Sequence, residues 1–273
     1  MRPFTDEFPK SMLPVAGRPF LHYQLDWLAA EGIDEVVYCL GYRGEMIRDY
    51  VGDGGRWGLK ATYVDEGAQL RGTAGAVRLA LDAGVLDPAF ALLYGDSFIR
   101  LSIPEVWARF EQSQPPALMT VIRNEGQWDR SNASYENGRV IAYDKAAQDI
   151  KPPARYIDYG FSVLTSEVVA QEIPPGTTSD LAALFHALSA EGRLAGFEAT
   201  DRFYEVGSPA GLKDFEEYVR QRQAAPVIRT TASRRRIGVL GGGLAGLTVA
   251  AHLTSDCEVL EADERPGGHC QTV

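Results

Sequence analysis

The chain has 273 residues, 45% of them hydrophobic, and a formal net charge of −10 at pH 7. This composition supports a substantial core and excludes a disordered tail or a fibrous repeat. The acidity disfavours a general nucleic-acid or anionic-membrane binder, because those surfaces need clustered positive charge.

The first ~220 residues alternate helix and strand signals, which is typical of an α/β fold with a mostly parallel, Rossmann-like sheet. Apolar residues at helical spacing predict helices over 18–31, 44–51, 72–83, 104–112, 179–190 and 208–221. Apolar runs predict strands over 35–40, 59–64, 90–94, 117–122, 156–164 and 203–206, of which 35–40, 90–94 and 117–122 read as buried. Asn137-Gly138 predicts a hairpin turn within 134–143.

The composition changes after residue 221. Residues 222–235 have no periodicity and carry Pro226. Three adjacent arginines, at 234–236, stand at the end of this segment. We interpret 222–235 as a linker, although the arginines could contact a small anion. Residues 236–273 then give a strand, a helix and a second strand over 237–240, 245–253 and 257–260, as in the start of a βαβ unit.

The N-terminal stretch carries the first motif with chemical meaning. It reads Arg2-Pro3, then Pro9-Lys10, then Leu13-Pro14-Val15, and Gly17-Arg18-Pro19-Phe20 stands at a helix start. Over residues 1–221 the chain resembles the sugar-1-phosphate nucleotidyltransferases, with the heptose-1-phosphate guanylyltransferases and the mannose- and glucose-1-phosphate enzymes closest in pattern. The resemblance implies that an NTP and a sugar 1-phosphate are converted to an NDP-sugar and pyrophosphate.

That reaction brings two polyanions together, so it requires fixed cations and a divalent metal. By the resemblance, Lys10 contacts phosphates, and Asp96, in Tyr94-Gly95-Asp96-Ser97, holds Mg²⁺. Glu205 completes the metal site, where many members of the family have Asp. Each of these residues also has an interpretation without function. Lys10 could be a solvated surface lysine, Asp96 could start a turn, and Glu205 could be an exposed acid in an ion pair.

The remaining candidates would hold the substrates. Gly72-Thr73-Ala74 opens a predicted helix, whose N–H groups suit an anion or a base edge. The resemblance assigns Arg2 to substrate binding, Lys145 to the sugar phosphate, and Asp158-Tyr159-Gly160 to the sugar pocket. Gly72–Ala74 could equally be a tight helix entry, and Asp158 a solvated loop acid.

Two features of the family pattern are missing from this sequence. The Gly-rich phosphate loop and the buried strand before it would stand upstream of Arg2. We therefore expect a central gap in the sheet, a true start further upstream, and doubtful activity for the chain as it stands. A non-catalytic sugar-nucleotide-binding module is an alternative interpretation.

The C-terminal segment indicates a second function. Gly241, Gly243 and Gly246 stand in G-x-G-x-x-G register between a strand and a helix, and Glu261 ends the next strand. With Arg265-Pro266-Gly267-Gly268, the segment resembles the start of FAD-dependent amine-oxidase-like oxidoreductases. We expect FAD binding only if that domain were complete, so the chain could also be a fragment of a fusion with such an enzyme.

The other expectations are exclusions. Cys39, Cys257 and Cys270 are odd in number and widely spaced, which excludes a disulfide scaffold and a metal knuckle. No apolar run approaches the ~20 residues of a membrane span, and no signal peptide opens the chain. We therefore expect a cytoplasmic protein without nucleic-acid or membrane partners, and the oligomeric state stays open.

Overall fold

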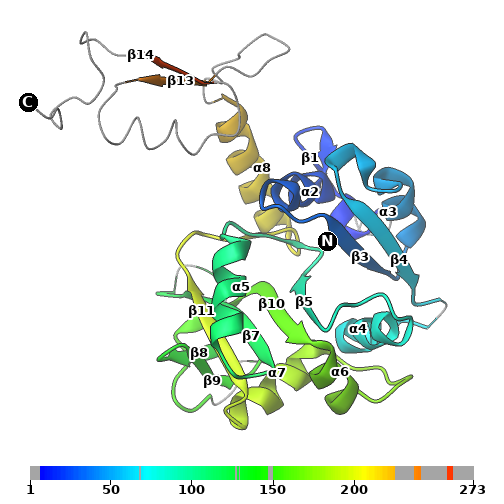
Figure 1. Cartoon of the computed structure of the whole chain (residues 1–273), viewed down its shortest axis with the longest axis vertical. Coiled ribbons are helices and arrows are strands. Elements are labelled where there is room, and N and C mark those ends of the chain that lie inside the picture. The colour runs from blue at the N-terminus through cyan, green and yellow to red at the C-terminus, as the bar shows by residue number, and fades with distance from the viewer. Residues whose placement is uncertain are drawn as a thin grey trace, which may run out of the picture. The chain divides into compact units, whose positions relative to one another are not determined.

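Figure 1 shows the computed structural model of the chain, which describes residues 7–67, 69–126, 128, 130–146, 150–224, 237–240 and 257–260. The chain divides into two compact units, Met1–Arg220 and Gln221–Val273.

The first unit contains a six-stranded mixed sheet with the order β5-β10-β7-β11-β9-β8. Its strands are β5 (Ala89–Leu93), β7 (Ala117–Arg123), β8 (Ala133–Glu136), β9 (Arg139–Tyr143), β10 (Tyr156–Thr165) and β11 (Leu194–Ala199). Strands β7 and β11 pair in parallel, whereas β10 runs antiparallel to both β5 and β7. The prediction of a mostly parallel sheet is therefore wrong here, because β8, β9 and β10 follow one another without a helix and such strands pair antiparallel.

A separate parallel pair lies beside this sheet. Strands β3 (Glu35–Leu40) and β4 (Lys60–Asp65) are joined by α3 (Gly44–Val51) and the short 3₁₀ turn η2 (Gly55–Trp57). Two small antiparallel pairs complete the strands of this unit: β1 (Pro14–Val15) with β2 (Arg18–Pro19), and β6 (Ser97–Phe98) with β12 (Tyr204–Glu205).

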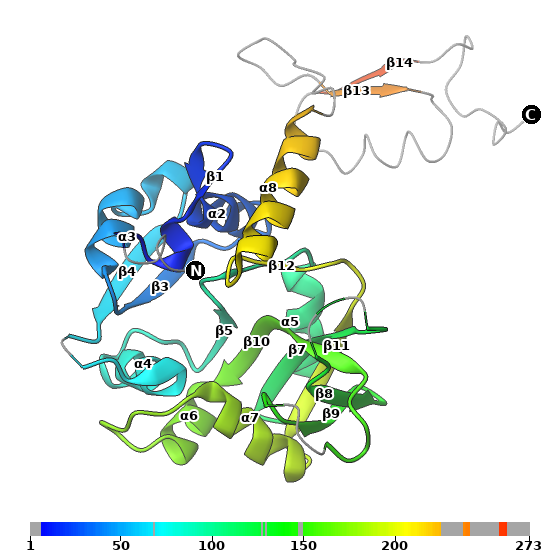
Figure 2. The ribbon, with the colours of Figure 1, turned by 180° about the vertical axis from the view of Figure 1, so that it is seen from behind.

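Helices cover both faces of the six-stranded sheet, as the two opposite views show (Figures 1 and 2). They are α4 (Gly72–Asp82), α5 (Ile103–Gln112), α6 (Ser166–Glu172) and α7 (Leu181–Ala190). Helices α2 (Phe20–Ala30), which follows the 3₁₀ turn η1 (Lys10–Met12), and α8 (Pro209–Ala224) instead share a core with the small strands β1 and β6. Alternate residues of β5 belong to different cores: Phe90 and Leu92 pack with α4 and α7, whereas Leu93 packs with α5.

Two strands predicted as buried are only partly covered. Strand β7 is buried along six of its seven residues, as predicted, but β3 has one buried residue and β5 has none. The reason is pairing: β3 pairs with β4 alone and β5 with β10 alone among the described strands, so each has an open edge. Among the described residues, the β3–β4 pair and the six-stranded sheet are therefore not hydrogen-bonded to each other as strands.

In the second unit, β13 (Ile237–Leu240) pairs in parallel with β14 (Cys257–Leu260), from Ile237 opposite Cys257 to Leu240 opposite Leu260. The helix predicted over 245–253 and most of the predicted linker lie outside the described residues. Among the residues that are described, no helix is long and apolar enough to cross a membrane.

Candidate active site

Lys10 and Asp96 meet at the end of the six-stranded sheet. The Lys10 Nζ atom lies 2.9 Å from Asp96 Oδ2, and the side chains are 46% and 33% exposed. Lys10 begins η1, and Asp96 lies in the turn between β5 and β6. Two residues that the sequence assigned separately to phosphate and metal thus form one ion pair at the surface.

Gln24 holds the turn that carries Asp96. This side chain of α2 is 2% exposed, and its Nε2 donates to the carbonyl oxygens of Tyr94 at 3.0 Å and Ser97 at 2.7 Å. On the other side of the turn, the Val206 N–H donates to the Asp96 carbonyl at 2.9 Å. Gln24 had no signal in the sequence, because a buried amide on an amphipathic helix is not part of any recognisable motif.

Glu205 lies on the strand that pairs beside Asp96. In the β6–β12 pair, Glu205 stands opposite Ser97, the residue after Asp96. No cluster of three or more His, Cys, Asp or Glu side chains in the described part of the chain is arranged to hold a metal ion. Asp96, in the turn before β6, and Glu205, on β12, are the two carboxylates predicted for Mg²⁺, which takes one or two protein carboxylates and fills its other positions with water and phosphate oxygens.

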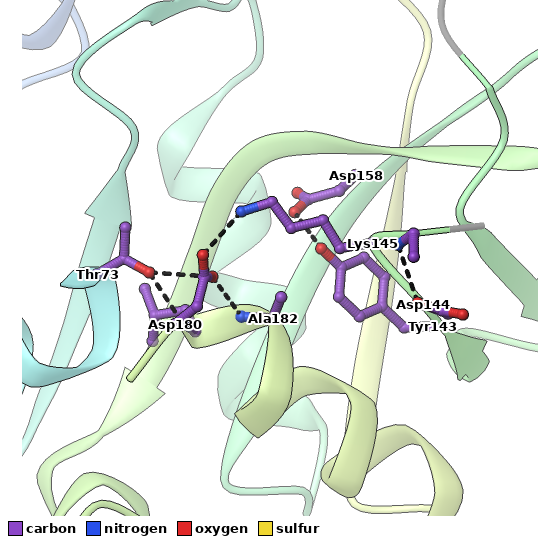
Figure 3. Close-up of polar contacts among 9 residues, drawn as sticks. Thr73, Tyr143, Asp144, Lys145, Asp158, Asp180 and Ala182 are labelled. Carbon is purple, nitrogen blue, oxygen red and sulfur yellow. Dashed lines mark hydrogen bonds and ion pairs between the residues drawn. The ribbon is translucent and has the colours of Figure 1, made fainter. Parts of the chain in front are cut away.

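A second ion pair lies near the start of α4 and α7 (Figure 3). Lys145 Nζ donates to Asp180 Oδ2 at 2.8 Å, and Thr73 Oγ1 donates to Asp180 Oδ1 at 3.2 Å. Asp180 is also the N-cap of α7, since its side chain accepts from the Ala182 N–H. Burial alone would raise the pKa of Asp180, but the hydrogen bonds from Lys145 and Ala182 hold that pKa below its ordinary value.

The start of α4 has a structural task that the sequence analysis did not foresee. The Ala74 and Gly75 N–H groups donate to the Ser179 carbonyl, so they are not available to an anion as predicted. Gly72 has φ +71°, and a Cβ there would lie 2.5 Å from Ser179 O. The Gly-Thr-Ala-Gly segment therefore packs α4 against the loop before α7, and Thr73 alone of the predicted three adds a polar side chain to the site.

Asp158 lies within reach of the second ion pair. Its Oδ1 accepts from the Gly160 N–H at 3.0 Å, and its Oδ2 accepts from the Tyr143 hydroxyl at 3.4 Å. Burial raises the pKa of Asp158 to about 6 despite these donors and nearby Lys145. Figure 3 shows Lys145 extending past Asp158 toward Asp180. Asp158 is thus a partly buried acid, not a solvated loop residue.

The Tyr159 ring is a core residue, which corrects its assignment to the sugar pocket. It is 1% exposed and packs with Phe203, and its hydroxyl bonds to the backbone of Arg100. Gly160, by contrast, lies at the site, since it has φ +92° and a Cβ there would be 3.1 Å from the Ser97 Cβ. The lack of a side chain at Gly160 lets β10 approach the turn that carries Asp96.

The Tyr94 hydroxyl is influenced by carboxylates of both ion pairs. Burial raises the pKa of its hydroxyl above its ordinary value, and the nearby charges of Asp158, Asp180 and Asp96 act in the same direction. The carboxylates of Asp158, Asp180 and Asp96 therefore all act on one phenol, which directly follows β5. No sequence motif marked Tyr94 as a site residue, because it reads as the last residue of the apolar run predicted as a strand over 90–94.

Several predicted residues lie outside the described part of the chain. They are Arg2 at the N-terminus, and Gly241, Gly243, Gly246 and Glu261 of the second unit. Cys39 is a free cysteine whose thiol donates to the Ala76 carbonyl at 3.5 Å, and burial raises the pKa of that thiol to about 11.

Two family models match this sequence. Residues 1–135 match "Nucleotidyl transferase", and residues 239–273 match "NAD(P)-binding Rossmann-like domain". The first match confirms the resemblance to the nucleotidyltransferases, and the second supports a dinucleotide-binding start in the C-terminal segment.

Curated relatives are sugar-1-phosphate nucleotidyltransferases. The mannose-1-phosphate guanylyltransferase of Mycobacterium tuberculosis is 28% identical over 235 residues, which are 84% of this chain and 64% of that protein. The D-glycero-alpha-D-manno-heptose 1-phosphate guanylyltransferase of Aneurinibacillus thermoaerophilus is 32% identical over 52% of this chain and 61% of that protein. A glucose-1-phosphate thymidylyltransferase of Streptomyces antibioticus is 27% identical over 66% of this chain and 51% of that protein. The chain thus spans less than two thirds of the length of these relatives.

Solved structures share the fold. A putative glucose-1-phosphate thymidylyltransferase from Bacillus anthracis, in complex with a sucrose, superposes with a TM-score of 0.68 at 19% identity, over 81% of this chain and 90% of that one. HddC from Yersinia pseudotuberculosis, complexed with GMP-PN, gives a TM-score of 0.65 at 18% identity, over 78% of this chain and 90% of that one.

Proposed function

We propose, from the premise that residues 1–135 belong to the nucleotidyl transferase family, that the chain transfers a nucleotidyl group to a sugar 1-phosphate. A phosphate oxygen of the sugar 1-phosphate attacks the α-phosphorus of the NTP, the bond to the β-phosphate bridging oxygen breaks, and pyrophosphate leaves. The observation that carries the proposal is the pair of lysine–carboxylate contacts, Lys10–Asp96 and Lys145–Asp180, around Tyr94. Two separate cations suit two polyanionic substrates that repel each other.

Each cation has a distinct role in this proposal. Lys10 neutralises phosphates of the NTP, and Lys145 neutralises the phosphate of the sugar, each as a compact point charge on a flexible stem. The Lys10 and Lys145 side chains are 46% and 62% exposed, so each can turn from its carboxylate to a substrate phosphate.

Three carboxylates supply the proposed metal site and the proposed sugar site. Asp96 and Glu205 would hold Mg²⁺, which when bound neutralises charge on the phosphates. Asp158 would accept hydrogen bonds from sugar hydroxyl groups, since Tyr143 and Gly160 hold its two oxygens at the site. The names of the relatives favour a heptose or hexose 1-phosphate as acceptor.

Pyrophosphate release tests this function directly. Purified chain is assayed with Mg²⁺ and a matrix of four NTPs against glucose, mannose and heptose 1-phosphates. We expect one NTP–sugar pair to dominate and EDTA to abolish release. Nucleotide binding by calorimetry with no release from any pair would contradict the enzyme and favour a non-catalytic binding module.

Substitution of Lys145 makes the assay specific for the proposed sugar site. Lys145→Met should raise the KM for the sugar 1-phosphate by about tenfold or more while changing the KM for the NTP little. Lys213→Met is the matched control, because Lys213 is 77% exposed on α8 and pairs only with Glu217 at 3.8 Å among the contacts described. An equal effect of both substitutions would contradict the role of Lys145.

A second function is favoured by the other unit. Gly241, Gly243, Gly246 and Glu261 carry the dinucleotide pattern, and residues 239–273 match an NAD(P)-binding family model. We propose that this segment is the start of an oxidoreductase domain that binds FAD. Because FAD binding is expected only of the complete domain, a form of the chain that continues into that domain is titrated with FAD and with NAD⁺ beside the present chain. Saturable FAD binding by the longer form that Gly243→Val removes supports the proposal, and NAD⁺ binding alone contradicts it.

A further inference from the structure

Strand β9 ends at Tyr143, two residues before Lys145, and no second strand holds this end. Tyr143 stands opposite Ala133 of β8 on one side. On the other side, β9 pairs with β11 only at Arg139, so none of the described strands pairs with Tyr143 there. Tyr143 is 3% exposed, and buried backbone groups need hydrogen-bond partners. The N–H and the carbonyl of Tyr143 therefore depend on another element.

Two side chains of α7 supply these partners. The Ser189 Oγ atom accepts from the Tyr143 N–H at 3.1 Å, and the His186 Nδ1 atom lies 2.7 Å from the Tyr143 carbonyl oxygen. Because a carbonyl oxygen only accepts, His186 Nδ1 carries the hydrogen atom. Ser189 in turn donates to the His186 carbonyl at 2.8 Å, which closes a ring of hydrogen bonds through the three residues. Helix α7 thus takes the place of a neighbouring strand at the end of β9.

The same end of β9 carries two groups into the candidate site. The Tyr143 hydroxyl donates to Asp158 Oδ2 at 3.4 Å, and the Tyr143 ring packs edge-on against Phe185 of α7. Lys145 follows two residues later, and its Nζ atom donates to Asp180, the N-cap of α7 (Figure 3). The backbone that α7 holds at Tyr143 is therefore the base from which both groups extend.

We propose that His186 is a positioning residue for the sugar 1-phosphate: its bond to the Tyr143 carbonyl fixes the segment that presents Lys145 and the hydroxyl that holds Asp158. The inference rests on the proposed function, in which Lys145 binds the phosphate of the sugar. His186 itself is exposed, so water can replace it at the carbonyl. Its loss should therefore loosen the segment without unfolding the chain.

Kinetics of two His186 variants test this role. Leucine has no donor for the Tyr143 carbonyl, whereas the Asn Nδ2 group is bonded to Cγ, as His Nδ1 is, and can donate from the same position. His186→Leu should raise the KM for the sugar 1-phosphate about fivefold or more, with kcat and the KM for the NTP changed less than about twofold. His186→Asn should return the KM for the sugar 1-phosphate to within about twofold of the parent value.

Ala190→Leu is the matched control. It places the same leucine one turn further along the exposed side of α7, and it should leave all three kinetic constants unchanged. Circular dichroism of the three variants checks that they fold. A purely structural role of His186 would leave the KM for the sugar 1-phosphate unchanged in the folded His186→Leu chain, and this result would overturn the proposal.

The titration of Asp158 gives a second readout, which needs no turnover. Burial raises the pKa of Asp158 to about 6, while the Gly160 N–H, the hydroxyls of Tyr143 and Tyr94, and the charge of Lys145 lower it. A loosened Tyr143 hydroxyl favours the charged form less, so His186→Leu should move the midpoint to higher pH. Carbon-13 NMR of the carboxyl groups measures the midpoint, with Asp158→Asn identifying the signal.

His186→Asn should return this midpoint to that of the parent chain. An unmoved midpoint in His186→Leu would overturn the proposal. A shift that His186→Asn leaves in place would also overturn it, because the ring would then act through its charge and not through its hydrogen bond. A parent chain without turnover would contradict the proposed function, whereas the Asp158 midpoint would still measure the link from His186. A parent chain that turns over, with an unchanged KM in His186→Leu, would contradict this inference alone.

Discussion

The ammonium of Lys10 lies 2.9 Å from Asp96 Oδ2, although 86 positions separate the two residues in the sequence. An ion pair with side chains 46% and 33% exposed contributes little to folding, about 0–1 kcal/mol. The turn that carries Asp96 is nevertheless held on both sides, by the Gln24 amide and by the Val206 N–H. The Lys10–Asp96 ion pair is thus weak, while the backbone that carries Asp96 is fixed by hydrogen bonds. This arrangement is expected of side chains that leave each other and bind substrate groups instead.

The first prediction separates activity from stability at this pair. Lys10→Met and Asp96→Asn should each lower pyrophosphate release about 100-fold or more, because each removes charge at the reacting phosphates. Each should change the free energy of unfolding by less than about 1 kcal/mol in urea titrations.

The control is an ion pair of similar exposure away from the site. Arg193 lies 2.7 Å from Glu172, with side chains 35% and 33% exposed, and also 2.8 Å from the more exposed Glu191. Arg193→Met should change stability as little as Lys10→Met does and leave turnover unchanged. If Lys10→Met keeps full turnover, or unfolds the chain, the proposed role of this lysine is wrong.

The second prediction concerns Gln24, which acts on the site through the turn. Gln24→Leu leaves the carbonyl oxygens of Tyr94 and Ser97 without their buried donor, which costs about 1–3 kcal/mol of stability. Because the turn then loses its support, kcat should fall while the KM values change less. Gln171→Leu, on the exposed face of α6, should change neither quantity. Rates equal to the parent chain in a destabilised Gln24→Leu variant would make Gln24 purely structural.

Much of the fold could be predicted because its elements are local. The bounds of β3 and α3 agree with the sequence prediction, and so does the Asn137-Gly138 turn, where both residues have positive φ. Strand β11 was missed, because Gly196 interrupts its apolar run. A Cβ at Gly196 would lie 2.5 Å from the Tyr135 ring, so this glycine marks close packing within a sheet and not a loop.

Residues of the candidate site could be predicted only where they are part of a sequence motif. Motif resemblance named Lys10, Asp96, Lys145 and Asp158 one by one, and the structure pairs Lys10 with Asp96 and places the charge of Lys145 near Asp158. It could not find Asp180, Gln24 or Tyr94, because an N-cap, a buried amide and a strand-end phenol occur in any α/β chain. It also misassigned the N–H groups at the start of α4, since the carbonyl that occupies them belongs to Ser179, more than 100 residues later.

The third prediction tests the packing of α4 against that loop. Gly72 and Gly176 have nearly the same φ, +71° and +72°, but only at Gly72 would a Cβ meet an atom within 4 Å, namely Ser179 O at 2.5 Å. Gly176→Ala should therefore cost only the backbone strain of about 1 kcal/mol, and Gly72→Ala should cost at least about 1 kcal/mol more. Urea unfolding of both variants measures the difference. Equal costs would mean that the loop before α7 moves freely away from α4.

The fourth prediction is a pH dependence at Asp158. Burial raises the pKa of this carboxyl to about 6 in the folded chain, against ~3.9 when unfolded. The folded state therefore holds the neutral acid more tightly, and this contribution to stability is present below pH ~4 and lost as the pH rises through 6. A shift of about two units corresponds to roughly 3 kcal/mol.

Asp158→Asn cannot ionise, so the variant should gain stability relative to the parent chain by roughly 2–3 kcal/mol between pH 4 and pH 8. Asn keeps an Oδ1 acceptor for the Gly160 N–H but loses the Oδ2 acceptor of the Tyr143 hydroxyl. Because that loss does not depend on pH over this range, the part of the difference that changes between pH 4 and pH 8 reports the charge. Urea unfolding at both pH values measures it, and the exposed Asp201→Asn corrects for the general loss of a carboxylate. A difference between Asp158→Asn and the parent that stays constant from pH 4 to pH 8 would contradict the raised pKa. In that case Asp158 would already be ionised and ready to accept sugar hydroxyl groups at every working pH.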